Sequence, residues 1–341
     1  TFTGDYFIRN TEGMLADSYE LPGVFGAKTP DENCADLRTN GWELYLGWND
    51  SFALMGKRFN YTVSATLGDN RTVFTKFNNP EKNLSNHYEG KVLGEIWGYR
   101  VDGLFASDEE AAEYTSKINQ DAVNERILTD KVDPYYRAGD LKFRDLDGDN
   151  VISKGDDTAY DAGDREIIGN ETPRYMYSFR LGADWNGFDL GIFFQGVGKR
   201  DWYPNYLSTG FWGPYSRAFT SFIPENFMDQ CWSEENRDGY FPRFRGYQTF
   251  AGSQLGVNND RYLQDASYIR LKNLTVGYTL PVLKKVFTKL RVYFTGENLW
   301  YWSPMLKHTK YIDPEAAGGN GNTGMAYNYS RNFSVGVDIT F

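Results

Sequence analysis

Cysteine and histidine are scarce in this chain: two residues of each kind occur among 341. Cys34 and Cys231 lie far apart in the sequence. They form either a disulfide or two unrelated thiols, and the sequence does not decide between these, because spacing alone does not show whether their Cα atoms are close enough to be bridged. His87 and His308 are also far apart, and we expect both to be solvated loop residues. No base, nucleophile and orienting group are clustered in the sequence, so we expect a protein that is not an enzyme.

Long apolar runs are missing as well. No stretch of about 18 apolar residues occurs, which excludes a transmembrane helix, and no signal peptide is visible. The first residues, Thr1 to Thr3, read as part of a strand, so we interpret the sequence as a processed chain or a fragment of a longer one. The net charge of −10 and the pI near 4.9 make nucleic acid an unfavourable partner.

Aromatic residues, in contrast, make up 17% of the chain, as expected of a β-barrel with aromatic girdles at both membrane interfaces. The last nine residues alternate strictly, and the apolar side holds Phe333, Val335, Val337, Ile339 and Phe341. Such a bare apolar strand face is typical of a barrel wall that meets lipid. Ser334, Gly336, Ile339 and Phe341 also match the C-terminal signal that barrel-assembly machinery reads in the bacterial outer membrane.

Period-2 alternation predicts eight strands along the chain. They cover about 3–10, 41–50, 58–69, 174–185, 188–197, 267–280, 289–300 and 332–341. Near the middle, Asn186-Gly187 predicts a two-residue type I′ turn that places Trp185 opposite Phe188. Before it, Ser107 with Glu110 forms a capping-box pattern and predicts a helix over about 108–119.

The connections between these strands alternate between short and long. Residues 51–57, 186–187 and 281–288 form the short links, whereas 11–40, 70–173, 198–266 and 301–331 form the long ones. Strict alternation places all long loops at one end of an antiparallel sheet. The sequence therefore predicts an all-β fold, a transmembrane antiparallel β-barrel with short periplasmic turns and long extracellular loops.

One loop has the spacing of a calcium site. Its candidate ligands are Asp145, Asp147, Asp149, the backbone carbonyl of Val151, Ser153 and Asp156, which match positions 1, 3, 5, 7, 9 and 12 of an EF-hand loop. Ile152 occupies the usual apolar anchor position, while Asn150 replaces the usual glycine and Asp156 the usual glutamate. We predict a bound structural Ca²⁺; the alternative is a solvated acidic turn whose aspartates accept backbone N–H groups.

The segment 199–250 is crowded with aromatic side chains that follow neither a helical nor a strand period. The candidate contact residues are Trp202, Tyr203, Tyr206, Phe211, Trp212 and Tyr215. Three interpretations stay open: the rings pack against one another, they dock a protein partner, or they contact a substrate. Tyr and Trp are frequent interface anchors, and sugars stack on aromatic faces.

Several segments together resemble the C-terminal third of the SusC-like (RagA-type) TonB-dependent outer-membrane transporters. They are GWELYLGWND at 41–50, GEIWGYRVDGLF at 94–105, GDLKFRDLDGDNVI at 139–152, 164–196, SYIRLKNLTVGYTLP at 267–281, RVYFTGENLW at 291–300 and the final FSVGVDITF. The resemblance implies a 22-stranded barrel with a plug and a TonB box, powered through TonB. It also implies a SusD-like surface lipoprotein as a lid and the import of oligosaccharides or peptides.

The 341 residues would supply only about eight strands of such a barrel, without the plug, the TonB box and about 14 further strands. We therefore expect residues 1–341 to be the C-terminal part of one receptor barrel. The alternative is a complete eight-stranded outer-membrane barrel with a structural or adhesive role, since eight strands are enough to close a barrel.

Overall fold

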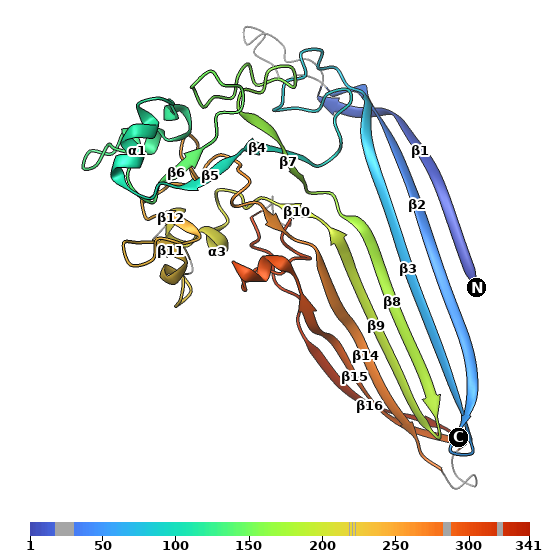
Figure 1. Cartoon of the computed structure of the whole chain (residues 1–341). Helices are drawn as coiled ribbons and strands as arrows, with labels where there is room; N and C mark the ends of the chain where they lie inside the picture. Colours follow the sequence, from blue (N-terminus) through green and yellow to red (C-terminus); the bar gives the residue numbers. More distant parts are fainter. Residues whose placement is uncertain (18–30, 218, 220, 222, 282–287, 319–322) are drawn as a thin grey trace.

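One large antiparallel sheet dominates the computed structural model, which describes residues 1–17, 31–217, 219, 221, 223–281, 288–318 and 323–341. Its eight strands lie in the order β1-β2-β3-β8-β9-β14-β15-β16, so each pairs with the next long strand along the chain (Figure 1). They are β1 (Phe2–Asp17), β2 (Asp31–Leu54), β3 (Lys57–Lys76), β8 (Arg174–Trp185), β9 (Phe188–Lys199), β14 (Tyr268–Thr279), β15 (Lys289–Trp302) and β16 (Asn332–Thr340). All eight predicted strands are present, and the sheet does not close, because β1 and β16 do not pair.

The first three strands are longer than the alternation predicted. β1, β2 and β3 have 16, 24 and 20 residues, so they extend into the predicted loops 11–40 and 70–173. In these extensions polar and apolar pairs are mixed: Thr39 pairs with Thr72 and their hydroxyls hydrogen-bond at 2.8 Å, whereas Ala35 and Phe74 pack in a small buried cluster with Phe77. Because the two kinds of residue do not alternate regularly, a period-2 pattern does not detect these parts of the strands. The loop residues 18–30 lie outside the described part of the chain.

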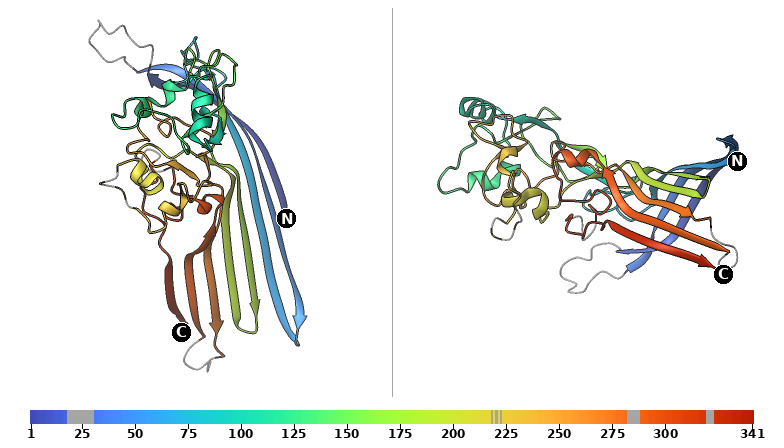
Figure 2. Two further views of the ribbon diagram at one scale, coloured as in Figure 1. Left: turned by 60° about the vertical axis from the view of Figure 1, so that its left-hand side comes forward. Right: turned by 90° about the horizontal axis from the view of Figure 1, so that it is seen from below.

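Short turns and long loops lie at opposite ends of the sheet, as predicted (Figures 1 and 2). At the β8–β9 turn, Asn186 and Gly187 have φ of 51° and 88°, the positive values that a type I′ turn needs, and Trp185 opposes Phe188. Met55 and Gly56 form the β2–β3 turn with φ of 50° and 75°. Of the third short link, residues 282–287 lie outside the described residues.

The register joins the apolar residues of all eight strands into one continuous face. One row runs from Val63 through Leu181 and Ile192 to Leu274, with each residue opposite the next. Along β16 the apolar side chains stay exposed, and Val335 is 77% exposed. The sheet thus presents a bare hydrophobic surface, the pattern of a wall that meets lipid.

The opposite face is polar and held by ion pairs between strands. Arg291 on β15 binds Asp189 on β9 at 2.7 Å and Asp338 on β16 at 3.0 Å. To reach Asp189 its side chain passes over β14 at Gly277, where a Cβ would lie 2.4 Å from the Asp189 carboxylate. Glycine is therefore required at 277 for this bridge. Gly336 has a similar role, because the ring of Tyr293 lies over its backbone.

The loops contain the helices and the short strands of the molecule. These are β4 (Glu95–Tyr99), β5 (Val101–Leu104), α1 (Asp108–Thr115), η2 (Asp121–Val123), α2 (Glu125–Leu128), β6 (Leu141–Phe143), β7 (Arg165–Asn170), β10 (Asp201–Trp202), α3 (Thr209–Trp212), η3 (Gly213–Tyr215), η4 (Met228–Gln230), β11 (Cys231–Trp232), β12 (Phe241–Arg243), β13 (Gln264–Asp265) and η5 (Pro304–Lys307). Every helix among the described residues is too short and too polar to cross a membrane.

The predicted helix 108–119 begins at its expected residue but ends earlier, at Thr115. The Ser107 hydroxyl accepts a hydrogen bond from the Glu110 N–H, which is the predicted cap. At the other end, the hydroxyls of Thr115 and Ser116 donate to helix carbonyls and compete with continuation.

The core of the molecule lies in the loops rather than on the sheet. Twenty buried residues between Ile96 and Ala317 form one cluster, which draws on the loops after β3, β9 and β15. Cys231 is buried in it, while Cys34 lies on β2 with its Sγ 3.6 Å from the Ala16 carbonyl, and no disulfide joins them. His308 stacks on the Tyr240 ring instead of being solvated as predicted, because its imidazole covers part of this core; His87 is exposed but also stacks, on Phe74.

Candidate functional site

Three of the predicted calcium ligands come together in the loop after β6. Carboxylate oxygens of Asp145, Asp147 and Asp149 all lie within 4.8 Å of one another, and the last two side chains are exposed. The Asp145 carboxylate accepts the N–H groups of Gly148 and Asn150 at 2.7 and 3.0 Å, which curls the loop around it. Oxygen atoms gathered in this way suit a hard cation such as Ca²⁺.

The backbone of this loop has a left-handed residue at position 6, where Asn150 replaces the glycine that is usual in an EF-hand loop. Asn150 has φ of 66°, the left-handed region that asparagine tolerates better than most residues. Next to it, Ile152 is fully buried in the loop core and anchors the loop as predicted. The Val151 side chain is exposed, and its backbone pairs with Asn119.

The remaining predicted ligands are arranged differently. Asp156 does not belong to the three-carboxylate group, and the Ser153 hydroxyl accepts the Gly155 N–H at 3.1 Å. A carboxylate that the sequence spacing does not reveal lies close by: Asp164 is fully buried and accepts the N–H groups of Leu146 and Ser153. Burial raises the pKa of Asp164, and the nearby carboxylates of Asp147 and Asp145 raise it further.

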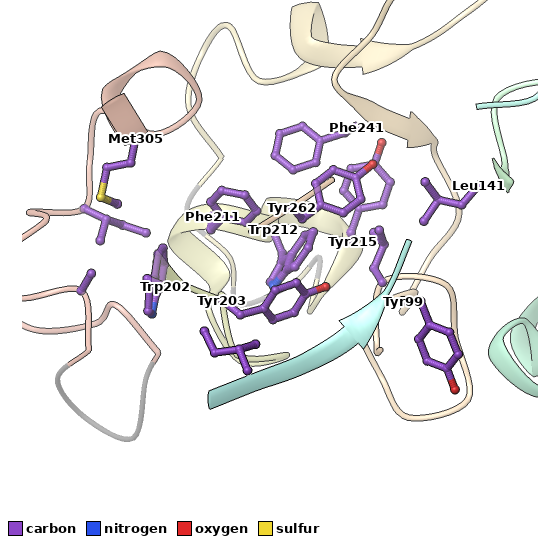
Figure 3. Close-up of a cluster of buried hydrophobic side chains, with 14 of the residues drawn as sticks. Tyr99, Leu141, Trp202, Tyr203, Phe211, Trp212, Tyr215, Phe241, Tyr262 and Met305 are labelled. Carbon is purple, nitrogen blue, oxygen red and sulfur yellow. The ribbon is translucent and has the colours of Figure 1, made fainter. Parts of the chain in front are cut away.

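Five of the six predicted aromatic contact residues are buried in the loop core (Figure 3). They are Trp202, Tyr203, Phe211, Trp212 and Tyr215. Phe241 lies at the centre, with ring centroids 5.5 Å from Phe211, 5.7 Å from Tyr215 and 5.1 Å from Phe227. For these five side chains the structure shows the first of the three interpretations, in which the rings pack against one another.

Tyr206 is the exception, since 44% of its surface is exposed. It lies at a cavity of about 590 Å³ whose wall comes from four loop segments, 84–97, 157–171, 203–206 and 255–258. The cavity is lined by charged side chains, including Lys91, Glu95 and Arg165, and by Trp97. A pocket of this size with an aromatic wall and polar groups suits a small organic ligand.

The residues of the predicted barrel-assembly signal lie on the last strand. Ser334, Gly336 and Ile339 oppose Thr295, Tyr293 and Leu290 of β15, and Phe341 follows the strand at its turn end. Ile339 and Phe341 are exposed at 48% and 84%, on the outer edge of the sheet. The signal itself stays a prediction.

The chain is similar in sequence and in structure to several known proteins. No family model matches the sequence. TonB-dependent receptor P3 of Formosa agariphila is 27% identical over 99% of this chain and 32% of its own length. TonB-dependent receptor P26 of the same organism is 25% identical, again over 99% of this chain and 32% of its own length. The chain therefore spans about one third of the length of the curated relatives it matches.

Solved structures share the fold. The RagAB peptide transporter superposes with a TM-score of 0.64 at 22% identity, covering 99% of this chain and 33% of that one. The RagAB peptide importer in its closed-closed state gives 0.65 at 21% identity, covering 100% and 33%. At these identities the likeness establishes the fold alone. Together with the sequence relatives it confirms the predicted resemblance: the chain is similar to SusC/RagA-like TonB-dependent receptors and spans about one third of the length of the proteins it matches.

Proposed function

We propose that this chain is part of the barrel wall of a TonB-dependent, SusC-like importer in the bacterial outer membrane. One observation carries the proposal: an eight-stranded sheet with an apolar face and sorted loops aligns end to end with one third of RagAB. In that setting the apolar face meets lipid, the long loops are extracellular and the C-terminus is periplasmic. The other strands of a 22-stranded barrel, the plug and the TonB box belong to the remaining two thirds.

The same proposal includes the partners that the resemblance implies. TonB would drive transport through the missing plug region, and a SusD-like surface lipoprotein would cover the loops. The substrate would be an oligosaccharide or a peptide; the solved relatives are named as peptide transporters, and the sequence relatives as receptors. None of these names is that of an enzyme, so we propose no catalytic role. Tyr206 and the cavity beside it are our candidate for contact with the partner or the substrate.

A stand-alone barrel with a structural or adhesive role is the alternative. It requires β1 to pair with β16, so that no strand edge stays open. In the described sheet both strands are edges. The transporter proposal accounts for these two edges, because further strands would pair with them.

The first test is purification of the protein in mild detergent from outer membranes. We expect the tagged polypeptide to be about three times as long as this chain and to bring down one surface lipoprotein in equal amount. A polypeptide of this length that is always recovered alone would overturn the proposal.

The second test concerns the cavity. Tyr206→Ala should weaken lipoprotein binding or substrate uptake. The control is Tyr135→Ala, since Tyr135 is a 63% exposed tyrosine of another loop and does not line the cavity. Equal effects of the two substitutions would remove Tyr206 from the proposal.

We also propose that the loop of Asp145, Asp147 and Asp149 binds a structural Ca²⁺. Support comes from the three converging carboxylates and the left-handed Asn150. The ion would tie the loop to the core through Ile152 and has no chemical role in transport.

A further inference from the structure

A second, smaller cavity of about 290 Å³ lies among the loops. Its wall is formed by α2 and the segment that follows it, together with the segment after β12. The lining residues are Arg126, Asp130, Val132, Asp133, Arg243, Phe244, Arg245, Gly246 and Gln248. Three of these residues are arginines.

Two of these arginines have no carboxylate partner among the described residues. Arg126 extends over the rings of Tyr247 and Phe250, with its guanidinium carbon 5.8 and 5.6 Å from the two centroids. Arg243 lies over Trp232 in the same way, at 5.8 Å. Aromatic faces orient a guanidinium without neutralising it, so both side chains keep their charge and their N–H donors for another group.

The acidic residues at the cavity are already engaged. Asp133 pairs with Arg137 at 3.0 Å and is 3.8 Å from Arg245. The Asp130 carboxylate accepts the N–H groups of Val132 and of Asp133. Arg245 in turn binds the buried Asp140 at 2.9 Å. Backbone N–H groups do not neutralise Asp130, so its carboxylate offsets part of the charge of Arg126 and Arg243. Three arginines against two aspartates still leave the cavity wall with a net positive charge.

Gln248 adds an independent sign of a missing partner. Its side chain is 1% exposed, and neither the nitrogen nor the oxygen of its amide has a hydrogen-bond partner among the described residues. A buried polar group that stays unsatisfied is destabilising, and native proteins rarely keep one without a reason. Here a whole amide, donor and acceptor together, lacks partners at the wall of a cavity with a net positive charge.

We propose that this cavity binds a small carboxylate-bearing ligand. The carboxylate is held by Arg126 and Arg243, whose planar guanidinium groups match its two oxygens. A polar group of the ligand hydrogen-bonds to Gln248, directly or through a water molecule. Its apolar part lies on Val132 and Phe244, which are 92% and 45% exposed.

The size of the cavity limits the ligand to about one residue. A volume of about 290 Å³ lies just below the usual range for small-molecule sites, which begins at about 300 Å³. Two sources offer a terminal carboxylate of that size: the C-terminal residue of a peptide and a uronate at the end of an acidic oligosaccharide. This inference does not need the transport function, and it could hold in a protein that imports nothing.

The test is calorimetric titration of the protein purified in detergent from outer membranes. Three probes are compared: N-acetyl-leucine, its primary amide, and galacturonate. We expect binding of at least one of the two carboxylates and none of the amide. Arg126→Gln and Arg243→Gln should each weaken that binding about tenfold or more, as for the loss of a charge-assisted hydrogen bond. Arg126 is exposed, so its substitution leaves the fold intact.

Arg237→Gln is the matched control. Arg237 is an exposed arginine of the same loop that pairs with Glu234 and does not line the cavity, so binding should be unchanged. Preference for N-acetyl-leucine supports the peptide source, and preference for galacturonate supports the saccharide source. Equal binding of acid and amide, no binding of any probe at 10 mM (about the weakest useful affinity), or insensitivity to both arginine variants would overturn the proposal.

Discussion

Acidification should loosen the loop core through His308. Its imidazole stacks on the Tyr240 ring with centroids 3.5 Å apart and planes 11° apart. Burial, together with the positive charges of Lys307 and Arg261, lowers the pKa of His308 from its ordinary 6.5 to about 4. The unfolded loop therefore binds a proton more readily than the folded one, so the contribution of this histidine to stability is present above pH 6.5. That contribution is lost as the pH falls from 6.5 towards 4.

The size of the effect follows from the two pKa values. One pKa unit corresponds to about 1.4 kcal/mol, so the whole shift is worth at most about 3 kcal/mol. Between pH 7.5 and pH 5 the expected loss is about 2 kcal/mol, and solvent around this half-buried ring makes that an upper value. A change of about 2 kcal/mol corresponds to a roughly thirtyfold increase in local opening.

Hydrogen exchange of the amides around Tyr240, corrected for the intrinsic effect of pH, measures this opening. His308→Phe keeps a stacked ring but cannot take up a proton, so its exchange should no longer depend on pH. His87→Phe is the control, because that histidine packs on Phe74, outside the loop core. If wild type and His308→Phe respond equally to acid, the reasoning about His308 is wrong.

Three further outcomes are expected. Asp147→Ala combined with Asp149→Ala should lower thermal stability by about 1–3 kcal/mol in calcium and not in chelator, and an equal change in both conditions would contradict ion binding. Phe241→Ala should destabilise the loop core by about 3–5 kcal/mol, seen as rapid proteolysis of the loops, whereas Phe219→Ala on the surface should not. Gly187→Ala should cost about 1–2 kcal/mol and reduce the folded fraction, because its φ is 88° and the added Cβ would lie 2.7 Å from a backbone carbonyl oxygen.

Much of the sheet was predictable because its information is local. The turn at Asn186-Gly187 is specified by two residues, and the alternation around it specifies which side chains share a face. The first part of β2 was not predicted, since a residue such as Thr39 is held in place by Arg9 and Thr72, which lie 30 and 33 positions away in the sequence. Strand pairing between residues far apart in the sequence produces no local hydrophobic period from which a strand can be predicted.

The loop sites show the same division. The acidic spacing from Asp145 to Asp149 predicted a cluster that the structure contains, because the loop is short and its geometry local. The residues next to Trp212 in the sequence do not show whether its side chain is an exposed anchor or part of the core. Its burial depends on Phe241 and Tyr262, which come from other segments. The cavity with Arg126 and Gln248 combines residues 122 positions apart, beyond the reach of any local pattern.

The length of β2 has a mechanical consequence in the proposed membrane setting. Its 24 residues span about 80 Å at about 3.3 Å per residue, and a tilt near 45° leaves a height of about 55 Å. The hydrocarbon layer takes up about 30 Å, so roughly 25 Å of this wall stands outside it. That rim is hydrogen-bonded to β1 and β3 along its length. A protein that binds to this rim would meet a rigid surface. Any conformational change on binding would then have to occur in the partner or in other loops.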